Sequence, residues 1–349
     1  MAKAKSKKPK PKEVTNEAEE INYDFIDKPR FSCAFGGAYT TITAIPGYLP
    51  IIHGGPGCGV QIQMGQTFLG GFRGSAHLSG LSTPSTNLYE NEVIFGGEER
   101  LDEQIGTTLE LYDEEHVVVL TACVPELIGD DVPGVLKKYE DKVKISHAST
   151  AGFKGTSYDG YELLLDSFVD QVVKKGRKRK KLVNVLGIVP SQDVFWEGNL
   201  IEIERLLNKA GLEVNTLFNG KDIEDLSKAA LNIVLSPWVG VEAAKKLEDK
   251  FGTPYIVNPL PIGVAKTSEF LRAVGDALEI DFEKIIEEEE EKAYWGIEKV
   301  SDFIIDFDLQ TKFATISDSN YAIAVNDFFV KEIGWIPYVA IINDAVDKK

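Results

Sequence analysis

Short apolar segments alternate with amphipathic segments through the middle of this chain, and this alternation constrains the possible folds more than any other feature. Continuous apolar runs, typical of buried parallel strands, occur at 182–189, 212–218, 232–235 and 255–257. Segments with helical spacing of apolar residues follow them, at 200–209, 223–230, 241–251 and 268–278. The alternation predicts an α/β fold made of a doubly wound, Rossmann-like parallel sheet.

The pattern is repeated on both sides of this middle segment, which predicts several such domains. We expect a disordered basic tail at 1–22, a first α/β domain at 23–180 that carries all three cysteines, and a second at 181–279. An acidic helical connector and the start of a third α/β domain would occupy 280–349. The third unit has strands only at 313–316 and 338–342, so we expect this domain to be incomplete, because two parallel strands cannot be covered on both faces.

Charge excludes some partners. The formal net charge is −17, and residues 1–12 contain six lysines and no acid, so the rest of the chain carries −23. Such a body should repel nucleic acid and favour a partner that presents lysine or arginine.

No apolar run reaches the ~18–20 residues of a membrane helix, and the N-terminal segment lacks the apolar core of a secretory signal. We therefore predict a cytoplasmic protein without a membrane partner.

The three cysteines stand in unusual local sequences. Cys33 precedes two glycines, Cys58 lies in the glycine loop His53-Gly-Gly-Pro-Gly-Cys-Gly59, and Cys123 follows a buried strand. Glycine lets backbone amides close around a bulky inorganic group, and thiolate is the standard ligand of iron–sulfur clusters. The residues alone leave three interpretations open: cluster ligands, a nucleophilic cysteine, or core thiols.

Five segments together resemble the α and β subunits of the nitrogenase component 1 family, over residues 30–349. The match rests on five signatures in the family's order: Cys33 with Gly36-Gly37; His53 to Gly59; Glu92-Val-Ile-Phe-Gly-Gly-Glu-Glu-Arg-Leu101; Cys123 with Glu126-Leu-Ile-Gly-Asp-Asp131; and Phe251-Gly-Thr-Pro254 with Pro261-Ile-Gly263.

The resemblance implies a function, a cofactor and partners. It implies that Cys33, Cys58 and Cys123 ligate an iron–sulfur cluster at a subunit interface, with Gly57 and Gly59 beside it. The cluster would be an 8Fe–7S P-cluster, as in nitrogen-fixing members, or a 4Fe–4S cluster. The partners would be a homologous α-type subunit, or a second copy of this chain, and an ATP-hydrolysing iron–sulfur reductase like the nitrogenase iron protein. The chain would then be an oxidoreductase subunit, active only in a complex.

Departures from the family pattern favour a β-like subunit. The chain has no cysteine after Cys123 and no histidine after His147, whereas α subunits anchor an iron–metal cofactor with a later cysteine and histidine. Gly152 stands where molybdenum-type β subunits carry a serine, and no catalytic residue can be named. The alternatives are a scaffold subunit for assembly of the metal cofactor, or an inactive or truncated paralogue.

Overall fold

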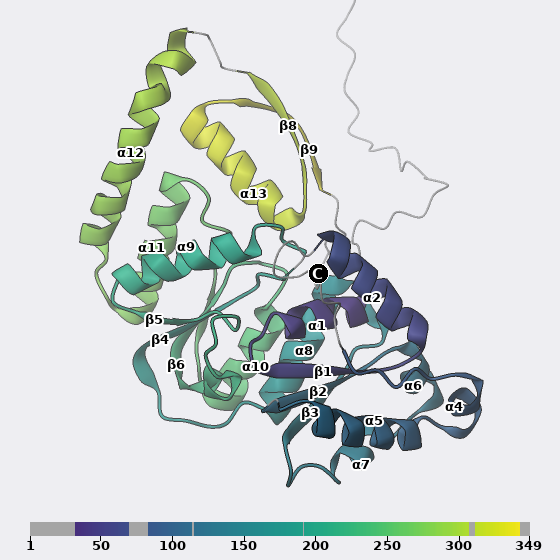
Figure 1. Cartoon of the computed structure of the whole chain (residues 1–349). Helices are drawn as coiled ribbons and strands as arrows, with labels where there is room; N and C mark the ends of the chain where they lie inside the picture. The colour runs from purple at the N-terminus through teal and green to yellow at the C-terminus, as the bar shows by residue number, and fades with distance from the viewer. Residues whose placement is uncertain (1–31, 70–82, 114, 191, 307–310, 343–349) are drawn as a thin grey trace, which may run out of the picture.

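The chain forms three parallel β-sheets flanked by helices (Figure 1). This computed structural model describes residues 32–69, 83–113, 115–190, 192–306 and 311–342. The tail predicted at 1–22 lies outside these residues. We call the parts of the chain built around the three sheets the first, second and third units. The predicted α/β class with repeated parallel sheets is confirmed.

The first sheet has the strand order β1-β2-β3. Its strands are β1 (Tyr48–His53), β2 (His116–Thr121) and β3 (Lys144–Ser149). Every residue of β2 is buried, and its side chains alternate between the two faces. Val118 and Leu120 pack in one core with α1 (Ala34–Thr43) and α8 (Ser157–Gln171). Val117 and Val119 pack in another with α5 (Glu98–Leu111) and α7 (Val132–Leu136).

The second sheet has the order β5-β4-β6-β7, and all its strands are parallel. They are β4 (Arg179–Leu186), β5 (Glu213–Asn215), β6 (Ala229–Val234) and β7 (Tyr255–Val257). Its helices are α9 (Trp196–Lys209), α10 (Val241–Phe251) and α11 (Val264–Leu278). The helix expected at 223–230 is a 3₁₀ segment, Ile223–Lys228, because β6 already begins at Ala229.

The third unit is smaller in the described residues. The acidic connector is the helix α12 (Glu283–Asp306), which runs along the outside of the molecule (Figure 1). The strands β8 (Lys312–Ser317) and β9 (Ile336–Ile342) pair in parallel around α13 (Ser319–Phe328), which continues as a π-helical turn to Ile333. All residues of β9 are exposed.

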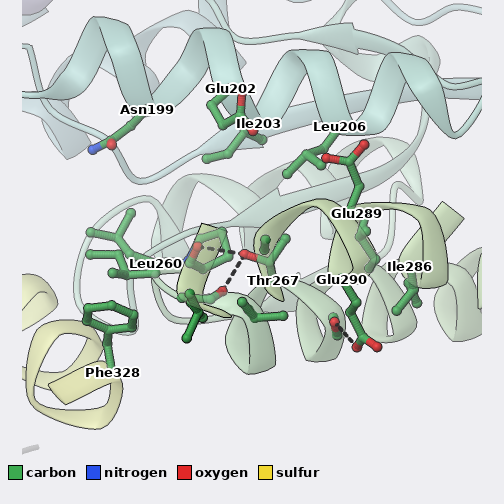
Figure 2. Close-up of a pocket in the computed structure, with 18 residues that line it drawn as sticks. Asn199, Glu202, Ile203, Leu206, Leu260, Thr267, Ile286, Glu289, Glu290 and Phe328 are labelled. Carbon is green, nitrogen blue, oxygen red and sulfur yellow. Dashed lines mark hydrogen bonds between the residues drawn. The ribbon is translucent and has the colours of Figure 1, made fainter. Parts of the chain in front are cut away.

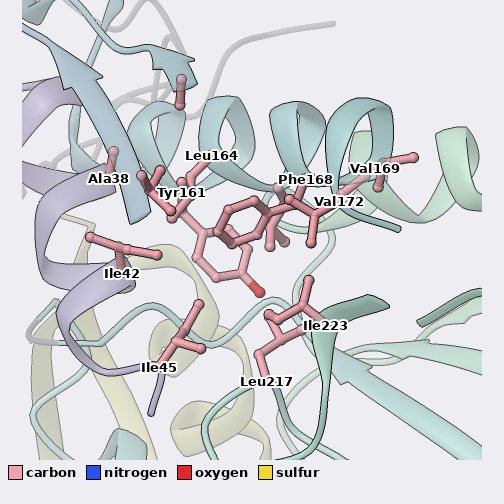
Figure 3. Packing of buried hydrophobic residues seen from close by; sticks show 14 of the residues in the cluster. Ala38, Ile42, Ile45, Tyr161, Leu164, Phe168, Val169, Val172, Leu217 and Ile223 are labelled. Carbon is pink, nitrogen blue, oxygen red and sulfur yellow. The ribbon is translucent and has the colours of Figure 1, made fainter. Parts of the chain in front are cut away.

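The first and second units share one hydrophobic core. Tyr161 and Phe168 of α8 are fully buried, and they pack in the same cluster as Ile42 of α1 and as Leu217 and Ile223 of the second unit (Figure 3). The hydroxyl oxygen of Tyr161 also accepts a hydrogen bond from Gly187 N, at 3.1 Å. The helix α8 therefore belongs to the packing of both sheets.

A buried carboxyl group lies on the same seam. The side chain of Glu162, on α8, accepts hydrogen bonds from the backbone N–H groups of Gly240 and Ala243 at the start of α10; the Ala243 bond is 3.3 Å long. Burial raises the pKa of Glu162 to about 7, against an ordinary value of 4.5. The contact therefore joins the two units through a group that titrates near neutrality.

We expect this carboxyl to make stability depend on pH. Because the folded pKa is the higher one, the native state binds the proton more tightly, and stability from Glu162 is lost as pH rises from about 4.5 to about 7. The loss is on the order of 2–3 kcal/mol in the free energy of unfolding. Urea unfolding across this range should show a steeper decline for the wild type than for Glu162→Gln, which cannot ionise. Parallel curves for the two proteins would contradict the assignment.

Candidate metal centre

Each of the three cysteines stands at the start of a helix. Cys33 is the N-cap residue of α1, Cys58 is the third residue of α2 (Pro56–Leu69), and Cys123 is the first residue of α6 (Cys123–Ile128). All three are free thiols. A helix N-terminus favours negative charge, so these positions lower the cost of holding thiolates. Cys58 and Cys123 follow β1 and β2, at the carboxyl edge where parallel sheets build their sites.

The structure brings Cys33 and Cys123 together at Gly152, which follows β3, and Cys58 lies near these two cysteines. The Gly152 N–H donates to Cys123 Sγ, with an N···S distance of 3.2 Å. A Cβ atom added to Gly152 would lie 2.9 Å from Cys33 Sγ and 3.2 Å from Cys123 Sγ. Burial raises the pKa of the Cys58 thiol, and the nearby Cys123 and Cys33 raise it further. Two sulfur atoms therefore lie beside one glycine, and the third thiol is close enough to interact with both.

A carboxylate braces this arrangement from behind. Glu126 Oε1 accepts hydrogen bonds from Thr121 Oγ1 at 2.6 Å and from Ala151 N at 2.9 Å, and Glu126 Oε2 pairs with Lys154 Nζ at 2.6 Å. Burial raises the pKa of Glu126, but the hydrogen bonds from Lys154, Thr121 and Ala151 outweigh it, so the pKa lies below its usual range. The ionised side chain links α6 to the 3₁₀ segment Gly152–Lys154.

His53 supports the glycine loop, and its two ring nitrogens lie within hydrogen-bond distance of Asp130 and Thr86. Its Nε2 lies 3.0 Å from Asp130 Oδ2, and its Nδ1 lies 3.2 Å from Thr86 Oγ1. Burial lowers the pKa of His53, so the neutral ring donates from Nε2 to the carboxylate. Asp130 Oδ1 also accepts from Gly97 N at 2.9 Å. This network joins three sequence signatures: the glycine loop, the Glu92–Leu101 segment and the Glu126–Asp131 segment.

The glycines near the cysteines have different roles. A Cβ on Gly37 would overlap the backbone of Ser157, so this glycine permits the close contact between α1 and α8. A Cβ on Gly57 would meet no described atom within 4 Å, and one on Gly59 would meet only Ile52 Cδ1, at 3.8 Å. Packing within the described chain therefore explains Gly37 and does not explain Gly57 or Gly59, which we assigned to the cofactor.

Three exposed apolar side chains lie on two neighbouring helices, one of which begins with Cys123, and they were not predicted from the sequence. The exposed fractions are 84% for Phe95, 73% for Leu127 and 70% for Ile94. These residues come from α4 (Glu90–Phe95) and α6, which pack together at one end of the first sheet (Figure 1). The signal was the apolar run ending at Gly96, in a helix of six residues that buries none of them. We call Ile94, Phe95 and Leu127 the apolar patch.

Two further features lie away from the cysteines. His116, Asp222 and Glu224 have their ligand atoms within 4.8 Å of one another. Lys144 Nζ lies 3.3 Å from His116 Nε2 and 2.9 Å from Glu224 Oε1, so an ammonium group already stands where a cation would bind. We therefore interpret this group as an ion-pair network.

The second feature is a cavity of about 400 Å³ between the second and third units (Figure 2). Its walls are mainly apolar side chains of α9, α11 and α12, with Phe328 of α13 at one end. Glu290, from α12, accepts a hydrogen bond from Ser268 Oγ at 2.6 Å, and Thr267 Oγ1 donates to Pro261 O at 3.1 Å. None of the elements that line the cavity carries a cysteine.

No helix among the described residues is long and apolar enough to cross a lipid bilayer. In solved structures, the fold is similar to that of nitrogenase Cp1, with a TM-score of 0.69 and 24% identity over 93% of this chain and 64% of that one. At this identity the likeness concerns the fold.

Curated relatives fall into two groups. The chain is 28% identical to the nitrogenase vanadium-iron protein beta chain of Trichormus variabilis, over 71% of this chain and 58% of that protein. It is 26% identical to the molybdenum-iron protein beta chain of Methanococcus maripaludis, over 90% and 72%. It is also 30% identical to the iron-molybdenum cofactor biosynthesis protein NifE of Clostridium pasteurianum, over 71% and 54%.

The chain thus spans a little over half the length of the first and third of these relatives. The family model for nitrogenase component 1 type oxidoreductases matches residues 33–348, which is nearly the whole chain. The predicted resemblance is confirmed: this protein belongs to the nitrogenase component 1 type oxidoreductase family.

Proposed function

We propose that this chain is a β-like subunit of a nitrogenase or nitrogenase-like reductase. In this role Cys33, Cys58 and Cys123 hold an iron–sulfur cluster at the interface with a homologous subunit, in the cytoplasm. The observation that carries the proposal is the meeting of Cys33 and Cys123 at Gly152, where an added Cβ would contact both sulfur atoms, with the Cys58 thiol near them. A nucleophilic cysteine needs one activated thiol with a base beside it, whereas this site gathers three thiols.

The residues present fit an iron–sulfur cluster. The donors are soft sulfur atoms, each at the start of a helix, and Gly152 supplies an N–H donor to one of them. Gly57 and Gly59 leave open space beside Cys58. When bound, such a cluster supplies one-electron transfer. The chain's own residues ligate it, orient its thiolates and exclude water from one side.

Exposure of Cys33 supports a shared site. Cys33 is exposed, whereas Cys58 and Cys123 are partly buried. A thiolate ligand that faces solvent needs a covering surface. Water beside a cluster forms hydrogen bonds to its sulfur atoms and changes its reduction potential. A homologous α-type subunit, or a second copy of this chain, would supply that cover. The site that reduces the substrate would lie on the α-type partner, because residues 124–349 of this chain contain no cysteine that could anchor a metal cofactor.

The apolar patch is suited to receive the ATP-hydrolysing reductase. Ile94, Phe95 and Leu127 are exposed, and Leu127 belongs to the helix that begins with Cys123. Contiguous exposed apolar residues commonly mark protein interfaces, with large aromatic side chains as anchors. An acidic body around the patch would steer a partner with a basic face. Electrons would then enter close to the thiolates.

A second candidate function is a scaffold for assembly of the metal cofactor. It is favoured by the 30% identity to the cofactor biosynthesis protein NifE of Clostridium pasteurianum. The three cysteines would have the same ligand role in either case. The two functions differ in whether electrons delivered to the complex reduce a substrate or accompany transfer of a metal cluster to another protein.

The experiment is electron delivery to the complex, purified without oxygen together with its partner subunit. We expect bound iron and sulfide, an iron–sulfur EPR signal, and cluster reduction by the protein reductase that depends on ATP. Turnover of dinitrogen, acetylene or protons would identify a reductase, whereas release of a metal cluster to an acceptor protein would identify a scaffold. A complex that binds no iron, even after reconstitution with iron and sulfide, would refute both functions.

A Phe95→Ser variant tests the docking surface in the same assay. Phe95 is 84% exposed and contacts no core, so the variant should fold and keep its iron. We expect the rate of cluster reduction by the protein reductase to fall about tenfold or more, as for an interface anchor. Reduction by dithionite should be unchanged, since a small reductant needs no docking. Equal rates with the protein reductase would exclude the apolar patch as the docking site.

A further inference from the structure

The side chain of Glu126 connects α6, the helix that begins with Cys123, to the loop around Gly152, which contacts the sulfur of Cys123. It lies one turn after Cys123 in α6, and its side chain is 14% exposed. One oxygen accepts from Ala151 N at 2.9 Å, and the other pairs with Lys154 Nζ at 2.6 Å. Gly152, between these two residues, donates its N–H to Cys123 Sγ. The Glu126 carboxylate thus binds the residues on both sides of Gly152, whose N–H contacts Cys123 Sγ.

Further hydrogen bonds hold the loop in place. Thr121 Oγ1 donates to Glu126 Oε1 and accepts from Thr150 N at 3.3 Å, and Thr150 Oγ1 donates to Thr121 O at 3.0 Å. Lys154 Nζ donates to Ser149 Oγ at 2.6 Å. The end of β2, the start of α6 and residues 149–154 therefore form one hydrogen-bonded block. Glu126 joins the start of α6 both to Thr121, at the end of β2, and to Ala151 and Lys154, on either side of Gly152.

We propose that Glu126 is a positioning residue that fixes the Gly152 N–H against Cys123 Sγ and thereby sets the reduction potential of the cluster. This inference rests on the proposed function. An N–H···S hydrogen bond withdraws electron density from a thiolate ligand, favours the reduced cluster and raises its potential. Gly152 has no side chain to hold it in place, so the direction of its N–H depends on the neighbours that Glu126 anchors.

A pair of variants with equal charge separates positioning from charge. Glu126→Gln and Glu126→Met both remove the negative charge and occupy similar volumes. Glutamine keeps an oxygen that can accept from Ala151 N, whereas methionine has no comparable acceptor. Loss of charge alone would shift both potentials equally and upward, since removing an anion near a cluster favours its reduction. Loss of positioning would lower the potential of the methionine variant relative to the glutamine variant.

Two readouts on the complex with its partner subunit test the proposal. We expect the midpoint potential, from an EPR-monitored titration, to be more negative in Glu126→Met than in Glu126→Gln. We also expect the amides of residues 150–153 to exchange hydrogen about tenfold faster in Glu126→Met than in the wild type, with Glu126→Gln close to the wild type. Glu110→Ala removes an exposed carboxylate of α5 in the same unit and should change neither readout.

The outcomes are distinguishable from failure of the proposed function. Equal potentials and equal exchange in the methionine and glutamine variants would overturn the positioning role. If the methionine variant does not fold, Lys154→Met removes the ion pair between the loop and Glu126. This variant should speed hydrogen exchange at the amides of residues 150–153. Unchanged exchange there would also overturn the proposal. A wild-type complex without a cluster would instead refute the proposed function, while the exchange measurement would still report on the loop.

Discussion

Replacing Cys58 by serine is expected to remove most of the iron from the anaerobically purified complex. Burial raises the pKa of the Cys58 thiol, so forming the thiolate at this partly buried site is unfavourable without a metal. Binding of a metal ion stabilises the thiolate. A serine hydroxyl is a poor substitute for thiolate with iron. Iron and sulfide analysis together with EPR would measure the loss, and Cys33→Ser and Cys123→Ser should act in the same direction.

The control is a substitution in the same helix that leaves the three thiols intact. Val60→Ala, two residues after Cys58 in α2, shortens a side chain that is 57% exposed, so the folded chain should tolerate it. We expect it to retain far more iron than any cysteine variant. Full iron content and an unaltered EPR spectrum in all three serine variants would show that the cysteines are ordinary core thiols, and the proposed cluster site would fall.

The second large effect concerns Asp130. Its side chain is 2% exposed and faces the fully buried His53, and it also accepts from Gly97 N. Asp130→Ala would leave the His53 Nε2–H and the Gly97 N–H buried without an acceptor, so we expect a loss of about 2–4 kcal/mol in the free energy of unfolding. Chemical denaturation would measure it, and cluster loading should fall because the glycine loop loses its support.

The neighbouring carboxylate is the matched control. Asp131 is exposed and accepts from Gly134 N at 3.0 Å as the N-cap of α7. Asp131→Ala should therefore cost about 1 kcal/mol, the usual effect of losing a helix cap. Equal losses in the two variants would show that the His53 network contributes no more than an ordinary cap.

The sequence predicted those strands that are continuous buried runs and those helices that have one apolar and one polar face. The last five residues of β4 are a buried run, and α10 has its apolar residues on one face, so both were predicted near their observed positions, at 182–189 and 241–251. The helix α1 was not predicted, because nearly all its residues are buried and its sequence, AFGGAYTTIT, has two glycines and no polar face. Only its contact with α8 explains why Gly37 is compatible with a helix there.

The candidate site was only partly readable. The local settings of Cys33, Cys58 and Cys123 and the family resemblance named the thiols, and the structure places them together. The brace formed by Glu126 and Lys154 joins residues far apart in the sequence around the turn at Gly152, and no local pattern specifies such a pair. The role of His53 likewise depends on Asp130, 77 positions away, so its structural interpretation needed the three-dimensional contacts.

The helix α8 links two places that the chain could otherwise move independently. It begins at Ser157, just after the loop that holds Gly152, and along its length Tyr161 and Glu162 are bonded to the second unit. Ala34 N also donates to Gly155 O at 2.9 Å, so the residue after Cys33 is bonded to the loop that leads into α8. A change in the angle between the first two units would therefore also move the loop that holds Gly152 against the sulfur of Cys123. The geometry at the thiols and the packing of the two sheets are thereby coupled through one helix.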